Sequence, residues 1–363
     1  MKRIGRLVIG LIMVLNCMFA VGLLLAAFSP YANPASVPLL SCLGLAFPAF
    51  LVANICFLLF WLIVRYKYAL LSVLVLLICF SQIRTYVPFN FRTDNIPEGS
   101  IKFLSYNIMA FGDLKKTAGK NEIIAYIKNS GADIICLQEF VVASNRKYLT
   151  QENVNKEMEG YPYSNIKKLG NGGVSSGIAC YSKYPILSAK EIDYGSDHNG
   201  SMIYEIKIGN DTITVVNNHL ESNKLTDEDR HLYEGMLASP ETQRMKRGVK
   251  LLVTKLGEAM AIRSAQADAV AKEIAASKHR TIIVCGDFND SPISRTHRVL
   301  SRNLDDAFTK SGRGLGISYN KNKFYFRIDN ILISKNLKSY NCTVDRSIKT
   351  SDHYPIWCYI SPR

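Results

Sequence analysis

The chain has 363 residues, with 44 Lys and Arg against 30 Asp and Glu, so its formal net charge is +14. Apolar residues make up 48% and charged residues 20%, which excludes a disordered or low-complexity protein. The charges are spread unevenly: residues 1–88 hold six basic residues and no acidic one, whereas the other 275 hold 38 basic and 30 acidic residues. This split excludes an ordinary soluble enzyme and a fully integral transporter, and it predicts a membrane anchor over 1–88 followed by a soluble domain.

Three apolar runs predict the transmembrane helices of this anchor. Leu7–Phe28 and Pro38–Val64 are uncharged and long enough to cross a hydrocarbon core of roughly 30 Å. Ala69–Ile83 is shorter, so Tyr68 and Tyr86 would have to lie at the two membrane interfaces. A cleaved signal peptide is the alternative for the first run, and the two apolar runs that follow weigh against it.

Basic residues beside the runs predict the orientation of the anchor. Lys2, Arg3 and Arg6 precede the first run, and Arg65 and Lys67 form the link between the second and the third. Because basic residues collect in cytoplasmic loops, we expect the N-terminus and this link in the cytoplasm. Three spans then place the rest of the chain on the periplasmic, or extracytoplasmic, side of the inner (cytoplasmic) membrane.

The cysteines argue for the opposite side. Five of the nine lie in the soluble domain, and four of these stand in apolar, strand-like runs that predict buried thiols. An odd number without an evident disulfide spacing is unusual outside the cytosol. We give the charge distribution the greater weight.

The soluble part alternates short β-rich runs with helical ones. We expect a linker at 89–99 and a domain at 100–363. Strands are predicted at residues 101–107, 133–138, 177–181, 202–208, 212–219, 281–286, 328–333 and 356–360, and helices at 121–129 and 261–277. This mixture of hairpins and helical crossovers predicts an α/β domain of packed sheets rather than a TIM barrel.

Residues 221–260 stand apart as a polar, then basic and helical, insertion in this domain. Arg244, Lys246, Arg247, Lys250 and Lys255 follow one another with no acidic residue among them. A surface helix packed on the domain is one interpretation. The alternative is a basic face for an anionic partner, either lipid headgroups or a phosphate polymer.

Polar motifs stand at the ends of six predicted strands, which is where a sheet builds its functional site. They are Ser105-Tyr106-Asn107, Leu137-Gln138-Glu139, Asn217-Asn218-His219, Gly286-Asp287-Phe288-Asn289, Arg327-Ile328-Asp329 and Ser351-Asp352-His353. Each motif alone has a simple explanation as a solvated turn. Six of them together indicate one site.

The residue types in these motifs fit one chemistry. Glu139, Asp287, Asp329 and Asp352 offer hard oxygen ligands, which suit Mg²⁺ or Mn²⁺ rather than zinc. A hard cation offsets charge on phosphoryl oxygens while a carboxylate orients the attacking water. The motifs therefore predict hydrolysis of a phosphodiester. A glycine-rich phosphate loop is missing from the sequence, which argues against P-loop NTP hydrolysis.

In order and spacing, the six motifs resemble the endonuclease/exonuclease/phosphatase superfamily. Its members include pancreatic-type deoxyribonucleases, apurinic-site endonucleases, neutral sphingomyelinases and inositol-polyphosphate 5-phosphatases. The resemblance runs from about Ile101 to Tyr359. It implies a four-layered sandwich of two packed mixed β-sheets flanked by helices, here preceded by about three transmembrane helices.

The resemblance also implies roles for the metal site and the attacking water. Glu139 would be the main Mg²⁺ (or Mn²⁺) ligand, and Asn107 and Asp352 would complete the metal and phosphate site. Asp287 would align or deprotonate the attacking water, with Asn289 beside it.

Two histidines would flank the phosphate. His353 would contact the scissile phosphate, and Asp329 would orient its imidazole. Sphingomyelinase-like and deoxyribonuclease-like members have a histidine at the position of His219, whereas apurinic-site endonucleases have asparagine. The sequence does not identify the acid that partners His219. Tyr181 either lies near the site or is a buried strand tyrosine.

Two functions of different classes follow. The first is a membrane-anchored, divalent-metal-dependent phosphodiesterase, acting on nucleic acid or on a lipid headgroup and bound to the bilayer through its N-terminal spans. The second is a catalytically inactive, membrane-tethered binding module of the same fold. Loss of a core residue would mark the second, and all eight site residues are present. No protein partner is predicted.

Overall fold

The computed structural model of the chain forms two compact units. It describes residues 2–114, 121–145, 148–169, 176–196, 199–223, 228–229, 235, 242–321 and 325–363. The first unit comprises the chain up to Tyr86 together with Asn223–Ala261 and Ser291–Arg298. The second comprises Val87–Ser222, Ile262–Asp290 and Val299–Arg363.

The first unit holds the predicted membrane segment. Its N-terminal helices are α1 (Lys2–Phe28), α2 (Pro38–Leu43), α3 (Phe47–Val64), α4 (Ala69–Ile78) and α5 (Phe80–Tyr86). Arg6–Tyr31 and Pro38–Val64 are long and apolar enough to cross a membrane, as expected. The third predicted span is bent by 64° between α4 and α5, so this pair forms either one broken span or a re-entrant loop.

A buried polar network joins α1, α3 and α4. The amide of Asn16 accepts a hydrogen bond from Trp61 Nε1 (2.9 Å) and donates one to Ser72 Oγ (3.2 Å), and all three side chains are fully buried. In an apolar environment an unpaired amide is costly, so this network favours one arrangement of the three helices. The bundle is therefore held by polar contacts as well as by apolar packing.

The helix predicted at 261–277 begins much earlier. α10 (Thr242–Ala275) is one continuous helix, and its residues up to Ala261 belong to the first unit. This helix includes the basic part of the insertion that was predicted at 221–260. Within that insertion, residues 224–227, 230–234 and 236–241 lie outside the described residues. Within the first unit, Gly257 of α10 packs closely against Pro38 of α2.

Two six-stranded sheets form the second unit. One has the strand order β11-β12-β1-β2-β4-β3, and the other has the order β5-β6-β7-β8-β10-β9. The strands are β1 (Ile101–Asn107), β2 (Ile134–Gln138), β3 (Tyr163–Lys168), β4 (Gly177–Ser182), β5 (Ile186–Ile192), β6 (Gly200–Ile208), β7 (Asp211–His219), β8 (Ile282–Asp287), β9 (Leu304–Asp306), β10 (Asp329–Ser334), β11 (Leu337–Val344) and β12 (Ile356–Pro362). The eight predicted strands are present. The four edge strands, β3, β5, β9 and β11, were not predicted.

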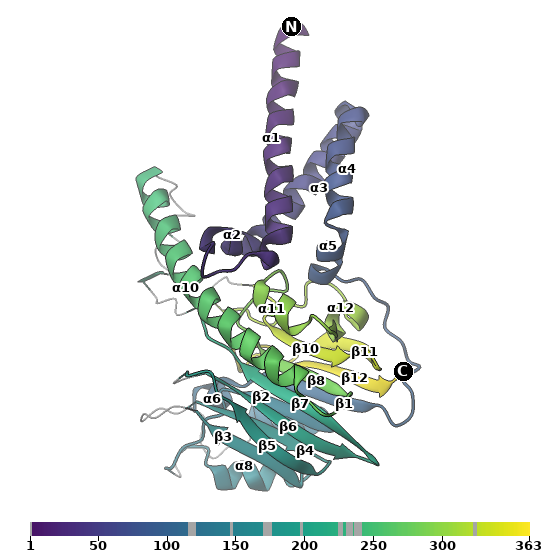
Figure 1. Ribbon diagram of the computed structural model, residues 1–363, viewed down its shortest axis with the longest axis vertical. Helices are drawn as coiled ribbons and strands as arrows, with labels where there is room; N and C mark the ends of the chain where they lie inside the picture. Colours follow the sequence, from purple (N-terminus) through teal and green to yellow (C-terminus); the bar gives the residue numbers. More distant parts are fainter. Residues whose placement is uncertain are drawn as a thin grey trace. The chain divides into compact units, whose positions relative to one another are not determined.

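The second unit is the expected four-layered sandwich (Figure 1). Buried residues from both sheets, such as Phe103, Cys180 and Tyr204, pack together between the sheets. Helices cover both outer faces: α7 (Glu122–Asn129) and α8 (Gln151–Glu157) pack on the first sheet, and the C-terminal part of α10 with the end of α11 (Arg295–Leu300) on the second. α12 (Ala307–Ser311) adds Phe308 to the core between the sheets, and α6 (Met109–Asp113) is a short turn after β1.

The predicted linker at 89–99 is part of the second unit and is bonded to it. Asn90 Nδ2 donates to the carbonyls of Thr309 (3.1 Å) and Gly312 (2.7 Å), and the backbone N–H of Thr93 donates to Asn341 Oδ1 (3.0 Å). These bonds anchor 89–99 along the domain rather than leaving it as a free tether.

Candidate active site

The strand register brings the polar motifs together at one end of the sandwich. Asn107 pairs with Gln138 across the parallel strands β1 and β2 of the first sheet. In the second sheet, Asp287 at the end of β8 lies opposite His219 on β7 and opposite Asp329 on β10. Asp287 is therefore flanked by two other site residues.

The backbone is left-handed at two site residues and in the segment after β1. Glu139 and Asn289, each just beyond a strand end, both have φ of 51°. Residues 109–114, after β1, also have positive φ throughout, and the N–H of Ala110 donates to the carbonyl of Glu139 (3.0 Å). Such conformations cost roughly 1–3 kcal/mol each in non-glycine residues and cluster at functional sites.

Gly286 allows β8 to lie close to β7 just before Asp287. Its φ is +122°, and a Cβ at this position would lie 2.0 Å from the carbonyl oxygen of Asn218. Only glycine fits such a close approach of two backbones. Gly286 is therefore required for the close approach of β7 and β8, whatever the chemical role of its neighbours in the motif.

Asn107 connects the two sheets at the site. Its Nδ2 donates to Oε1 of Glu139 (3.0 Å) and to Oδ2 of Asp287 (3.1 Å). Ser351 Oγ donates to the backbone carbonyl of Asn107 (2.8 Å), which ties the motif before β12 to β1. Two carboxylates from different sheets are therefore held by a single amide.

His353 lies between two carboxylates. Its Nδ1 is 2.8 Å from Oδ2 of Asp329, the carboxylate that was predicted to orient it, and its Nε2 is 3.6 Å from Oδ2 of Asp287. Burial alone would lower the pKa of His353, but the charges of Asp329 and Asp287 outweigh it and raise this pKa to about 10. The imidazole is therefore protonated at neutral pH.

Asp287 is almost fully buried and strongly held. Burial raises its pKa to about 6, although the nearby imidazoles of His353 and His219 act in the opposite direction. Its Oδ1 accepts the backbone N–H of Asn289 (2.8 Å), while the Asn289 side chain donates to the carbonyl of Leu220 (2.8 Å). Asn289 thus positions Asp287 through its backbone, with its side-chain nitrogen bound to a carbonyl.

The structure identifies the acid nearest to His219. Its Nε2 lies 3.6 Å from Oε1 of Glu139, and its buried Nδ1 has no hydrogen-bond partner among the described residues. Burial acts to raise the pKa of Glu139, but His219 and the Asn107 amide lower it, and the net shift is downward. Glu139 is therefore ionised near neutral pH.

Asp352 is partly exposed, and two residues near this part of the site were not predicted from the sequence. Its Oδ2 is 3.6 Å from Nζ of Lys321, and the ring of Tyr319 lies edge-on to the imidazole of His353 with the centroids 5.1 Å apart. Neither residue belongs to a strand-end motif, so no pattern marked them. Tyr181, in contrast, is a buried strand tyrosine that packs near Phe140.

Two groups of side chains could hold a metal. Asp287, Asp329 and His353 each offer a ligand atom, and these atoms lie within 4.8 Å of one another. Their closeness is already explained by the ion pairs of His353 with Asp329 and Asp287. Glu139, which is ionised and partly exposed, is the better ligand, beside Asn107. These hard oxygen donors fit Mg²⁺ or Mn²⁺.

Comparisons with known proteins identify the family of the chain. The sequence model described as "Endonuclease/Exonuclease/phosphatase family" matches residues 104–353. Residues 9–86, the predicted membrane segment, match a domain of unknown function. No curated protein matches the chain.

Solved structures share the fold at low sequence identity. The catalytic domain of human Nocturnin with bound sulfate is 16% identical, with a TM-score of 0.53 over 76% of this chain and 97% of that one. An endonuclease/exonuclease/phosphatase from Bacteroides vulgatus is 14% identical, with a TM-score of 0.50 over 73% and 100%. A humanized TDP2 from D. rerio is 15% identical, with a TM-score of 0.50 over 72% and 99%.

Proposed function

Because the chain belongs to the endonuclease/exonuclease/phosphatase family, we propose that it is a membrane-anchored, divalent-metal-dependent hydrolase of phosphodiester bonds. The observation that carries the proposal is the position of Asp287. This buried carboxylate is bonded to Asn107 of the other sheet and faces the protonated His353. A poised base beside a fixed cationic acid is what in-line attack of water on a phosphodiester requires.

The metal would be held by Glu139, Asn107 and Asp352. When bound, Mg²⁺ or Mn²⁺ supplies positive charge that offsets the negative charge on the phosphoryl oxygens. The ionised Glu139 and the partly exposed Asp352 give this group its negative charge. The Asn107 amide contributes a neutral ligand and fixes the orientation of Glu139.

Asp287 would orient the attacking water and accept its proton. A pKa of about 6 leaves this carboxylate ionised at neutral pH and still basic enough to take a proton. His353, held by Asp329, would donate a hydrogen bond from Nε2 to a phosphoryl oxygen as negative charge develops. His219, beside Glu139, would be the second imidazole at the phosphate.

The N-terminal unit would hold the enzyme in the inner membrane as a multi-pass anchor. The network of Asn16, Trp61 and Ser72 supports α4 as a third membrane helix, because it joins α4 to the two long apolar helices. With Arg6 and Arg65 on the cytoplasmic side, three spans would carry the catalytic domain to the periplasmic side.

Anchoring favours a substrate close to the membrane, such as a phospholipid or sphingomyelin-type headgroup. Nucleic acid is the other substrate class.

A substrate panel with the full-length chain in detergent micelles tests the proposal. Supercoiled plasmid, single-stranded oligonucleotide, sphingomyelin, phosphatidylinositol phosphates and bis-p-nitrophenyl phosphate are each incubated with Mg²⁺, Mn²⁺ or chelator. We expect hydrolysis of at least one substrate that chelator abolishes and metal restores, and that Glu139→Gln weakens by raising the metal concentration required. Full activity in excess chelator would contradict a metal-dependent hydrolase. Inactivity on every substrate would favour the alternative of a binding module.

A further inference from the structure

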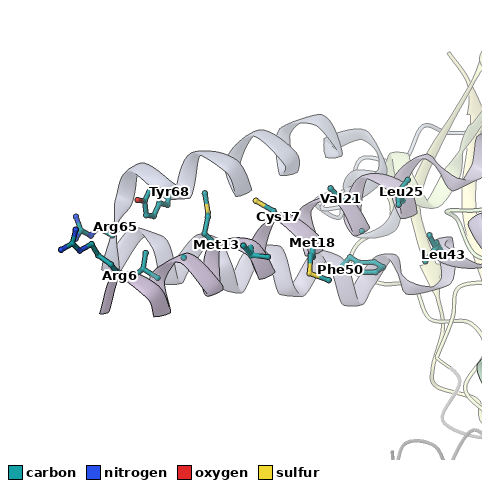
Figure 2. A pocket seen from close by; sticks show the side chains of 14 residues that line it. Arg6, Met13, Cys17, Met18, Val21, Leu25, Leu43, Phe50, Arg65 and Tyr68 are labelled. Carbon is teal, nitrogen blue, oxygen red and sulfur yellow. The ribbon is translucent and has the colours of Figure 1, made fainter. Parts of the chain in front are cut away.

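A long apolar groove runs along one face of α1 in the first unit. Its volume is about 1170 Å³, and ten residues of α1 from Arg6 to Leu25 line it at alternating intervals of three residues and one residue. These positions span about 28 Å of helix, close to the thickness of a hydrocarbon core. Phe50 of α3 and Leu43 of α2 form part of the opposite wall (Figure 2).

The two glycines on this face differ in their surroundings. A Cβ on Gly22 would lie 2.4 Å from the ring of Phe50, so Gly22 serves to bring α3 close to α1. A Cβ on Gly10 would meet no atom within 4 Å. Gly10 therefore widens the groove without serving the contact between the helices.

One end of the groove is cationic. Arg6, Arg65 and Tyr68 line it there, whereas the other end is lined by Leu25 and Leu43 (Figure 2). Both arginine side chains are exposed, and the first acidic residue of the chain is Asp94. A guanidinium binds phosphate with paired hydrogen bonds, so two of them beside a tyrosine hydroxyl form a suitable site for a phosphate group.

We propose that this groove binds one anionic glycerophospholipid, with its phosphate between Arg6 and Arg65 and an acyl chain along α1 past Gly10. The inference rests on the proposed membrane anchoring. It concerns a bound structural lipid, in a different place from the catalytic site.

The charges favour a lipid over a second copy of the chain. Copies inserted in one membrane have the same orientation, so a paired anchor would bring its own Arg6 and Arg65 to the same depth. Residues 1–93 contain no acidic side chain that could neutralise them. Like charges at such an interface are unfavourable, whereas the phosphate of an anionic lipid is complementary.

Native mass spectrometry of the full-length chain tests the proposal. The protein is delipidated in mild detergent and titrated with dioleoyl-phosphatidylglycerol or dioleoyl-phosphatidylcholine. We expect one phosphatidylglycerol to bind with an affinity at least tenfold above that of phosphatidylcholine. Arg6→Gln and Arg65→Gln should each weaken it about fivefold, equivalent to about 1 kcal/mol per basic residue.

Two further variants distinguish specific binding of the lipid in the groove from its nonspecific attraction to basic residues. Gly10→Leu keeps every charge and fills the groove, so it should reduce phosphatidylglycerol binding by at least tenfold. Lys67→Gln removes a charge from the same link, outside the groove, and should change affinity less than twofold. Equal losses for Lys67→Gln and Arg65→Gln, or unchanged binding by Gly10→Leu, would overturn the proposal. So would a dimer that Gly10→Leu dissociates.

A separate measurement distinguishes failure of the proposed membrane anchoring from failure of the proposed lipid site. If alkaline carbonate releases the chain from membranes, then the anchoring proposal fails. If the chain stays in the membrane but shows no preference for phosphatidylglycerol, then only the lipid site fails. Circular dichroism and thermal unfolding of each variant confirm that the helical bundle is intact.

Discussion

Nδ2 of Asn107 lies 3.1 Å from Oδ2 of Asp287, and this hydrogen bond joins the end of β1 in one sheet to the end of β8 in the other. The same nitrogen bonds Glu139. The proposed general base, Asp287, and the proposed main metal ligand, Glu139, therefore share one neutral donor.

Asn107→Ala should lower kcat/KM by roughly 10²-fold, since it frees both carboxylates at once. It should also raise the Mg²⁺ concentration needed for half-maximal activity. Steady-state kinetics over a metal titration measure both effects. Asn303→Ala, at an exposed turn, is the control and should leave both values unchanged. Unaltered metal dependence in Asn107→Ala would show that this amide has no part in the metal site.

The pH profile of kcat/KM should be bell-shaped. Activity rises as Asp287 loses its proton around pH 6 and falls as His353 loses its proton around pH 10. Bound metal should shift the acidic limb to lower pH, because a nearby cation favours the carboxylate. Asp329→Asn removes a negative charge that raises the pKa of His353, so the alkaline limb should move to lower pH. An alkaline limb that does not move in this variant would show that the limb reports another group.

His219→Ala should lower kcat by about 10²–10⁴-fold if this imidazole contacts the phosphate in the transition state. His279→Ala is a matched control, because His279 also lies near a glutamate, Glu205 at 3.4 Å, but precedes β8 at the end opposite Asp287. The control should keep wild-type kcat. A kinetically silent His219→Ala would assign His219 a structural role.

Gly286→Ala should destabilise the catalytic domain by about 2–3 kcal/mol or more, because the methyl group would collide with the Asn218 carbonyl in a strained backbone region. Thermal unfolding of the full-length chain in detergent measures the loss. Gly160→Ala is the control, since its Cβ would meet no atom within 4 Å and its φ is ordinary. Equal unfolding temperatures for the two variants would contradict the close approach of β7 and β8.

Much of the fold could be predicted because its central strands are apolar and end in polar motifs. β3 and β5 escaped prediction because they lie at sheet edges, where sequences such as Tyr163–Lys168 stay polar and largely accessible. The site residues could be named, but not their contacts. The proximity of His219 to Glu139 depends on how two sheets pack, which no local pattern records. Lys321 lies near Asp352 through a loop contact and carries no sequence signal at all.

The side of the membrane on which the proposed catalytic domain would lie depends on α4 and α5. A continuous third span puts the domain opposite the N-terminus, whereas a re-entrant loop bent by 64° returns it to the same side. Single cysteines at the exposed positions Glu98 and Lys67 distinguish these cases when intact cells are treated with a membrane-impermeant thiol reagent. Only Cys17, Cys42 and Cys56 need replacement first, because the domain's five cysteines and Cys79 are buried.

With three spans, Glu98→Cys should be labelled on intact cells and Lys67→Cys only after lysis. Verified access of the reagent across any outer membrane is the control. Labelling of both positions only after lysis would show that the α4–α5 pair does not cross. The catalytic domain would then face the cytoplasm, where its buried free thiols are ordinary, and the substrates to test would be cytoplasmic nucleic acids and inner-leaflet lipids.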